Sequence, residues 1–107
     1  MTDISHHCPQ AGTLRLVVQG PLTIYDAQAL KNRLLELLSE VPLQALELDL
    51  AQVPEIDTSG VQLLLLAARE AQHHQATVHT VAASEAVREV LEFCRLGAVL
   101  GMTPASA

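Results

Sequence analysis

Residues 44–72 decide the fold of this protein and read QALELDLAQVPEIDTSGVQLLLLAAREAQ. From Leu46 to Leu50, leucine alternates with an acidic residue, which is the two-residue period of a strand with one buried face. A short loop with Pro54 follows. Residues 61–72 then form a stretch that is long and apolar enough to be a largely buried helix. A strand, a loop and a buried helix in this order predict an α/β fold.

The residues before this stretch predict another strand and another helix. Residues 14–19 are rich in β-branched and aliphatic side chains, and a weaker pattern at residues 3–8 is consistent with an edge strand. From Asp26 to Glu40, apolar residues recur at three- and four-residue spacing, as on one face of an amphipathic helix. Asp26 is its N-cap or lies in its first turn, and Pro42 ends it.

The residues after this stretch repeat the order. Residues 76–81 are β-rich, and Ser84 is placed to cap a helix. Residues 96–102 are expected to form a last short strand or a helical turn, and residues 103–107 a frayed end. The apolar face of the expected helix consists of Val87, Val90, Leu91 and Cys94.

Strands that alternate with helices imply a mixed or parallel sheet covered by helices, because parallel strands need crossover connections. A length of 107 residues suits a single domain, residues 1–107.

Composition and charge disfavour several classes of partner. A formal net charge of −6 repels nucleic-acid phosphates and anionic membranes, and an aromatic content of 2% leaves no platform for stacking bases. The longest apolar runs are too short to span a bilayer, and residues 1–10 are polar, unlike a signal peptide, so we expect a cytoplasmic protein. Cys8 and Cys94 are expected to be reduced thiols.

The strongest local feature is Asp57-Thr58-Ser59-Gly60, which places a carboxylate, two hydroxyls and backbone amides at the start of a helix. A helix N-terminus accepts negative charge readily. The simpler interpretation is that Thr58 or Ser59 caps the helix while Asp57 complements its dipole. The four residues alone favour a helix cap over a binding site.

The order of motifs resembles the STAS domain family, which includes the anti-anti-sigma factors. The resemblance rests on Leu48-Asp49-Leu50, Val53 and residues 56–60 before a leucine-rich helix, on residues 19–27, and on residues 87–93 with Leu96. It implies a mixed β-sheet flanked by α-helices. It also implies a non-enzymatic signalling module that binds an anti-sigma factor or a related Ser/Thr protein kinase, with Thr58 as the phosphorylated residue.

The resemblance further implies roles for the residues around Thr58. Asp57 shapes the loop and helps to position the phosphate donor of the kinase, Ser59 caps the helix or contacts the partner, and Gly60 permits close approach. Asp49 and the turn that ends at Thr23 are expected neighbours in the partner-binding surface.

The sequence departs from the anti-anti-sigma pattern at two positions. Thr58 stands where many members have serine, and Gln62 replaces a residue that is often small. Threonine also occurs in STAS proteins that resemble the small cytoplasmic subunit of lipid-transport ABC complexes. The alternative function is therefore to bind and regulate a transporter ATPase, and a chemosensory protein is a third possible partner.

Other chemistries have weaker support. His6-His7 lie in a polar terminus, and His73-His74 lie at an expected helix end, where adjacent side chains point in different directions. We therefore expect solvated histidines and no metal site. The sequence has neither a Gly-x-Ser-x-Gly elbow for a hydrolase triad nor a glycine-rich phosphate loop with its lysine. We therefore expect no enzymatic activity and no cofactor.

Overall fold

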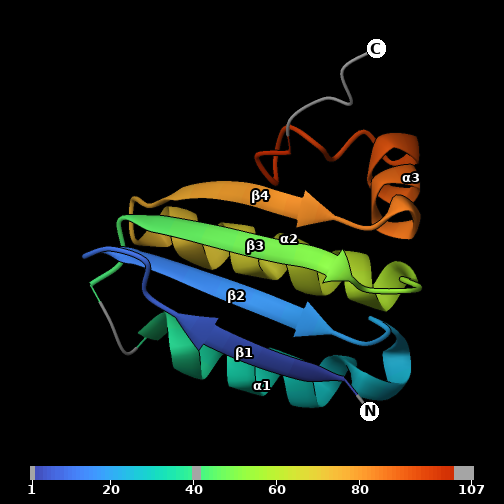
Figure 1. Ribbon diagram of the computed structural model, residues 1–107, viewed down its shortest axis with the longest axis horizontal. Helices are drawn as coiled ribbons and strands as arrows, with labels where there is room; N and C mark the ends of the chain where they lie inside the picture. The colour runs from blue at the N-terminus through green and yellow to red at the C-terminus, as the bar shows by residue number, and fades with distance from the viewer. Residues whose placement is uncertain (1, 40–41, 103–107) are drawn as a thin grey trace.

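The computed structural model describes residues 2–39 and 42–102, which form one four-stranded sheet and three helices (Figure 1). The sheet order is β1-β2-β3-β4; β1 and β2 are antiparallel, and the other neighbouring pairs are parallel. This confirms the predicted mixed sheet flanked by helices. The elements are β1 Asp3–His7, β2 Thr13–Gln19, α1 Ile24–Ser39, β3 Ala45–Gln52, α2 Thr58–His73, β4 Thr77–Ala83 and α3 Glu85–Phe93.

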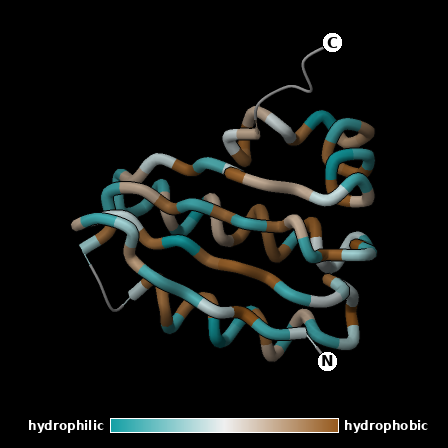
Figure 2. The backbone as a smooth tube through the Cα atoms, viewed as in Figure 1, coloured by the Kyte–Doolittle hydropathy of each residue, from teal (hydrophilic) through white to brown (hydrophobic). Residues whose placement is uncertain are grey.

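The core lies between the sheet and the helices α1 and α2, which run side by side along one face (Figure 1). Figure 2 shows hydrophobic stretches along the central strands and along the helices behind them. The alternation predicted for β3 is present, since its three leucines are at most 2% exposed. The largest fully buried side chains of the two central strands, β2 and β3, are those of Leu14, Leu16, Leu46, Leu48 and Leu50.

On the opposite face of the sheet, no helix of the described residues covers the middle of the strands (Figure 1). Arg15 pairs there with Glu47 at 2.7 Å, and Gln19 donates to Gln52 at 3.1 Å. Arg15 and Glu47 alternate with the buried leucines, so the two-residue period places them on the face opposite the core.

The predicted boundaries hold within a few residues. Helix α1 begins at Ile24, which places Asp26 in its first turn, and is described to Ser39. The expected last residue of this helix, Glu40, and the expected frayed end at 103–107 lie outside the described residues.

The prediction for Cys94 was wrong. Ser84 caps α3 as expected, and Val87 and Leu91 are fully buried, but Cys94 is the C-cap and is exposed. The helix ends at Phe93 and Arg95 turns back with φ of 58°, so the apolar period does not continue to Cys94. Cys8 is exposed as well, and both thiols are free.

After α3, residues 96–102 form turns and end at Met102, which makes an isolated parallel bridge with Thr80. Gly101 fits closely against β4: its φ is +62°, and a Cβ there would collide with the carbonyl oxygen of Val78. No helix within residues 2–39 and 42–102 has both the length and the apolar character required to cross a membrane.

Candidate functional site

Two loops meet at the edge where the parallel strands end and α1 and α2 begin (Figure 1). Leu22 and Ile56 form an isolated parallel bridge between the β2–α1 loop and the β3–α2 loop. The amide of Leu22 donates to the carbonyl of Glu55 at 2.9 Å, and the amide of Asp57 donates to the carbonyl of Leu22 at 3.1 Å. These bonds hold the start of α2 against the start of α1.

Asp57 joins the two helices through its carboxylate. Oδ1 accepts from the amide of Gly60 at 3.1 Å, which makes Asp57 the N-cap of α2. Oδ2 accepts from the amide of Ile24, the first residue of α1, at 3.0 Å. One negative charge therefore satisfies unpaired amides at the positive ends of two helices.

This geometry corrects the simpler interpretation of the motif. Neither Thr58 nor Ser59 is the cap, because both lie within the first turn of α2. The aspartate one residue earlier supplies the capping oxygen, so the two hydroxyl residues are not needed for that role.

Gly60 is buried where α2 packs against the β2–α1 loop. A Cβ at this position would collide with the carbonyl oxygen of Leu22 and lie 2.8 Å from Cγ1 of Ile56. Only glycine permits this close approach of the two loops, so the motif fixes their packing as well as the helix start.

Thr58 is the first residue of α2 and is exposed, whereas Ser59 beside it is half-buried. The exposed Thr58 hydroxyl stands at a positive helix end whose cap is the neighbouring carboxylate. Thr58 is therefore accessible from solvent, whereas the capping residue Asp57 is half-buried and Gly60 is buried.

The structure brings Thr23 to this site but not Asp49. Thr23 immediately precedes Ile24, and its carbonyl accepts from the amides of Asp26 and Ala27, both at 3.0 Å. Asp49 alternates with the buried leucines of β3, so its side chain lies on the sheet face opposite α2, where it accepts from the amide of Ala51 at 3.1 Å. The carbonyl of neighbouring Leu50 instead accepts from the amide of Ser84, the N-cap of α3, at 3.1 Å.

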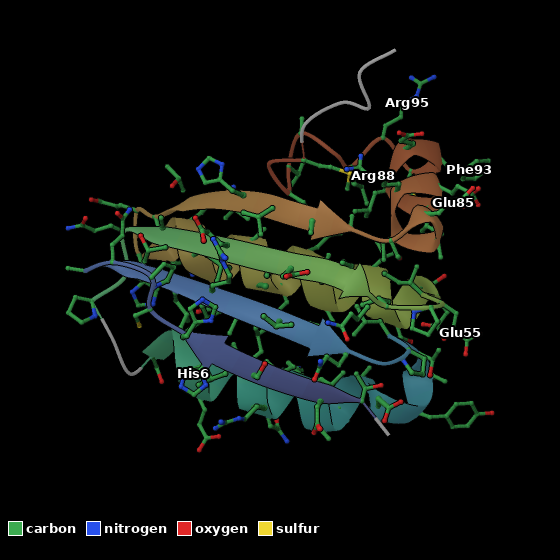
Figure 3. The ribbon with its side chains drawn as sticks, in the orientation of Figure 1. His6, Glu55, Glu85, Arg88, Phe93 and Arg95 are labelled. Atoms are coloured by element: carbon green, nitrogen blue, oxygen red, sulfur yellow. The ribbon has the colours of Figure 1, made fainter. Side chains whose placement is uncertain are left out.

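The third helix is attached to the same edge. The hydroxyl of Ser84 donates to the carbonyl of Val53 at 2.6 Å and accepts from the amide of Val87 at 3.2 Å. Figure 3 shows Glu55 on the β3–α2 loop, with Glu85 and Phe93 on α3, at this edge.

Sequence reasoning missed the exposed apolar side chains at this edge. Ile24 is 67% exposed, and the single tyrosine and single phenylalanine of the chain, Tyr25 and Phe93, are 94% and 90% exposed. Figure 3 shows Phe93 pointing away from α3 into solvent. The amino-acid composition was the signal that could have found them. Because leucine, valine and alanine are numerous enough to build the core, the two aromatic residues are candidates for contacts at the surface.

The histidines do not gather into a metal site. His6, His7, His73 and His74 are exposed, and only His73 has a carboxylate neighbour, Glu70, at 3.9 Å, within the described residues. No group of three or more potential metal ligands is found in residues 2–39 and 42–102.

Comparisons with known proteins agree with this architecture. A family profile described as "Mlab, STAS domain" matches residues 9–102, whereas no curated protein sequence matches significantly. The structure is similar to an anti-sigma factor antagonist from Mycobacterium paratuberculosis, at 19% identity and a TM-score of 0.81 over 98% of this chain and 87% of that chain.

Two structures of another antagonist are also similar. The anti-sigma factor antagonist SpoIIAA in its unphosphorylated form has 19% identity and a TM-score of 0.79, over 97% of this chain and 89% of that chain. The Bacillus cell fate determinant SpoIIAA in the phosphorylated form has 19% identity and a TM-score of 0.70, over 97% and 92%. At these identities, the likenesses establish a shared fold.

Proposed function

The chain belongs to the STAS domain family, and we propose that it is a cytoplasmic, non-enzymatic regulatory module whose partner binding is switched by phosphorylation of Thr58. The observation that carries this proposal is the exposed Thr58 hydroxyl, directly after the carboxylate that caps α2 and also accepts from the first amide of α1. The modifiable group is accessible, and the structure beneath it is held by other residues.

A phosphate at Thr58 would change the charge of this surface strongly. It adds about 1.5 to 2 negative charges beside the Asp57 carboxylate, at a helix end that can tolerate part of that charge. The helices would therefore stay folded while a docked partner meets a repulsive group. This combination suits a reversible switch of binding.

The proposed partner is an anti-sigma factor or a related Ser/Thr protein kinase, in a pathway that regulates transcription. The similar fold of proteins described as anti-sigma factor antagonists, one of them in a phosphorylated form, supports this choice. Thr58, Ser59 and Thr23 would form the contact surface, with Asp57 and buried Gly60 shaping it from below. Asp49 would contribute only to a partner that also reaches the opposite sheet face.

The second candidate function is regulation of a transporter ATPase. The residue that supports this second candidate is Gln62. Its side chain is exposed on α2 one turn after Thr58, at a position where a small residue is common in anti-anti-sigma factors. A long amide here alters the surface that a kinase would have to contact. A chemosensory protein remains a further partner class for the same surface.

The test begins with the protein isolated from its native cells together with its bound partners. Mass spectrometry identifies those partners and maps phosphate on the chain. We expect phosphothreonine at Thr58 and a co-purifying kinase. A transporter ATPase with unmodified Thr58 would favour the second candidate.

Variants then test the switch with the isolated partner. We expect Thr58→Asp to weaken binding, Thr58→Ala to abolish phosphorylation, and Thr58→Ser to retain it. Thr77→Asp is the matched control, because Thr77 is also exposed but lies at the start of β4, at the other end of the strands from Thr58. Unchanged binding of both Thr58→Asp and phosphorylated protein would refute the switch.

A further inference from the structure

A groove of about 640 Å³ runs between α1 and α2 on their outer surface. Its apolar lining includes Ile24 and Ala27 from α1, and Leu63 and Leu66 from α2. Lining residues recur at three- and four-residue spacing on both helices, so they form two ridges with an open channel between them. A third helix packs well in such a channel.

The groove is lined by positively charged side chains, although the protein as a whole carries a net negative charge. Lys31 and Arg69 line it, one from each helix, and its described lining contains no carboxylate. Two of the six basic residues of a chain with net charge −6 are thus placed in one groove. Within residues 2–39 and 42–102, neither side chain forms an ion pair with a carboxylate.

We propose that the α1–α2 groove binds an amphipathic helix of a partner protein that carries acidic residues beside its apolar face. The apolar lining supplies contact area for that face, and Lys31 and Arg69 supply complementary charges on the two sides. This proposal rests on the proposed function, because it names the chemistry of the partner that the Thr58 site would regulate.

The groove also explains the direction of the switch. Ser59 and Ile24 line the end of the groove beside Thr58. A phosphate there places about 1.5 to 2 negative charges at the mouth of a channel that otherwise attracts an acidic helix. Phosphorylation is therefore expected to weaken binding of this partner, and a basic partner would respond in the opposite way.

Helix α3 of a second copy of this chain has a chemistry similar to that expected of the partner helix. Glu85, Glu89 and Glu92 lie on α3 together with the exposed Phe93. A small apolar molecule is another conceivable occupant. Both are distinguished from a partner helix by the experiment.

The experiment introduces the photocrosslinking amino acid p-benzoylphenylalanine at Gln62, inside the groove, in the full chain expressed in its native cells. The same substitution at Asn32, exposed on α1 outside the groove lining, is the control. Mass spectrometry then identifies the crosslinked segment. We expect the Gln62 variant alone to crosslink to a helical segment of another protein that has acidic residues beside apolar ones.

A fluorescent synthetic peptide with the sequence of that segment then measures affinity by anisotropy. The double variant Lys31→Glu/Arg69→Glu is expected to weaken binding at least roughly tenfold, and lysine in place of the acidic peptide residues should restore it. Arg33→Glu is the matched control, since Arg33 lies on α1 outside the groove lining and its only described carboxylate neighbour is Glu36, at 3.9 Å.

Three results would overturn the proposal: no specific crosslink at Gln62, a crosslink to α3 of a second copy, or unchanged affinity of the double variant. If Thr58→Asp still weakens binding of the native partner while the double variant does not, the switch stands and the groove proposal fails. If the double variant weakens binding and phosphorylation does not, the groove proposal stands and the switch fails.

Discussion

Replacing Asp57 with alanine tests whether one carboxylate stabilises the starts of both helices. The substitution removes the bond from the Gly60 amide at 3.1 Å and the bond from the Ile24 amide at 3.0 Å. Because Asp57 is half-buried and partly solvated, each bond is assigned about 1 kcal/mol, the typical contribution of a helix cap or an ordinary hydrogen bond. The expected loss in the free energy of unfolding is therefore about 2 kcal/mol.

This loss is large enough to measure in two ways. At roughly 2.1 cal/mol/K per residue, the unfolding entropy of 107 residues is about 225 cal/mol/K, so Tm should fall by about 9 °C. Urea unfolding followed by far-UV circular dichroism should show a lower midpoint with an unchanged slope.

Asp57→Asn separates the two contributions. Asparagine caps a helix about as well as aspartate, but its amide nitrogen cannot accept from a second backbone amide. We expect this variant to lose about 1 kcal/mol, half the effect of Asp57→Ala. Equal stability of Asp57→Asn and the unmodified protein would refute the second bond, and a loss below about 0.5 kcal/mol in Asp57→Ala would refute both.

Three further predictions concern packing and backbone conformation. Gly60→Ala should lower the free energy of unfolding, measured by urea titration, by at least about 2 kcal/mol, because the added Cβ would meet the Leu22 carbonyl. The control Gly97→Ala should cost less than about 1 kcal/mol, because the nearest atom to its added Cβ is 3.9 Å away. Gln75→Gly should raise Tm through a gain of up to about 1 kcal/mol, since Gln75 has φ of 59° after α2; a lower Tm would contradict this reasoning. Phe93→Ser should change the free energy of unfolding by no more than about 0.5 kcal/mol, and a larger loss would mean that this exposed ring packs against the protein.

The local patterns of the sequence predicted most of the fold. Alternating leucines specify the buried face of β3, and the three- and four-residue spacing after Asp26 specifies the buried face of α1. These signals succeed because burial of apolar surface is the dominant favourable term and each element must present one apolar face to the core. The pattern failed at Cys94 because the helix had already ended one residue earlier.

The sequence by itself also located the motif at Asp57 to Gly60, since capping residues and glycine before a buried helix are local signals. Only the tertiary structure showed that Asp57 accepts from Ile24, 33 positions away, and that Asp49 lies on the other sheet face. Likewise, Lys31 and Arg69 are unremarkable on separate helices until α1 and α2 pack side by side. A local pattern determines which face of an element is buried, whereas the strand order and the packing of helices determine which distant residues meet.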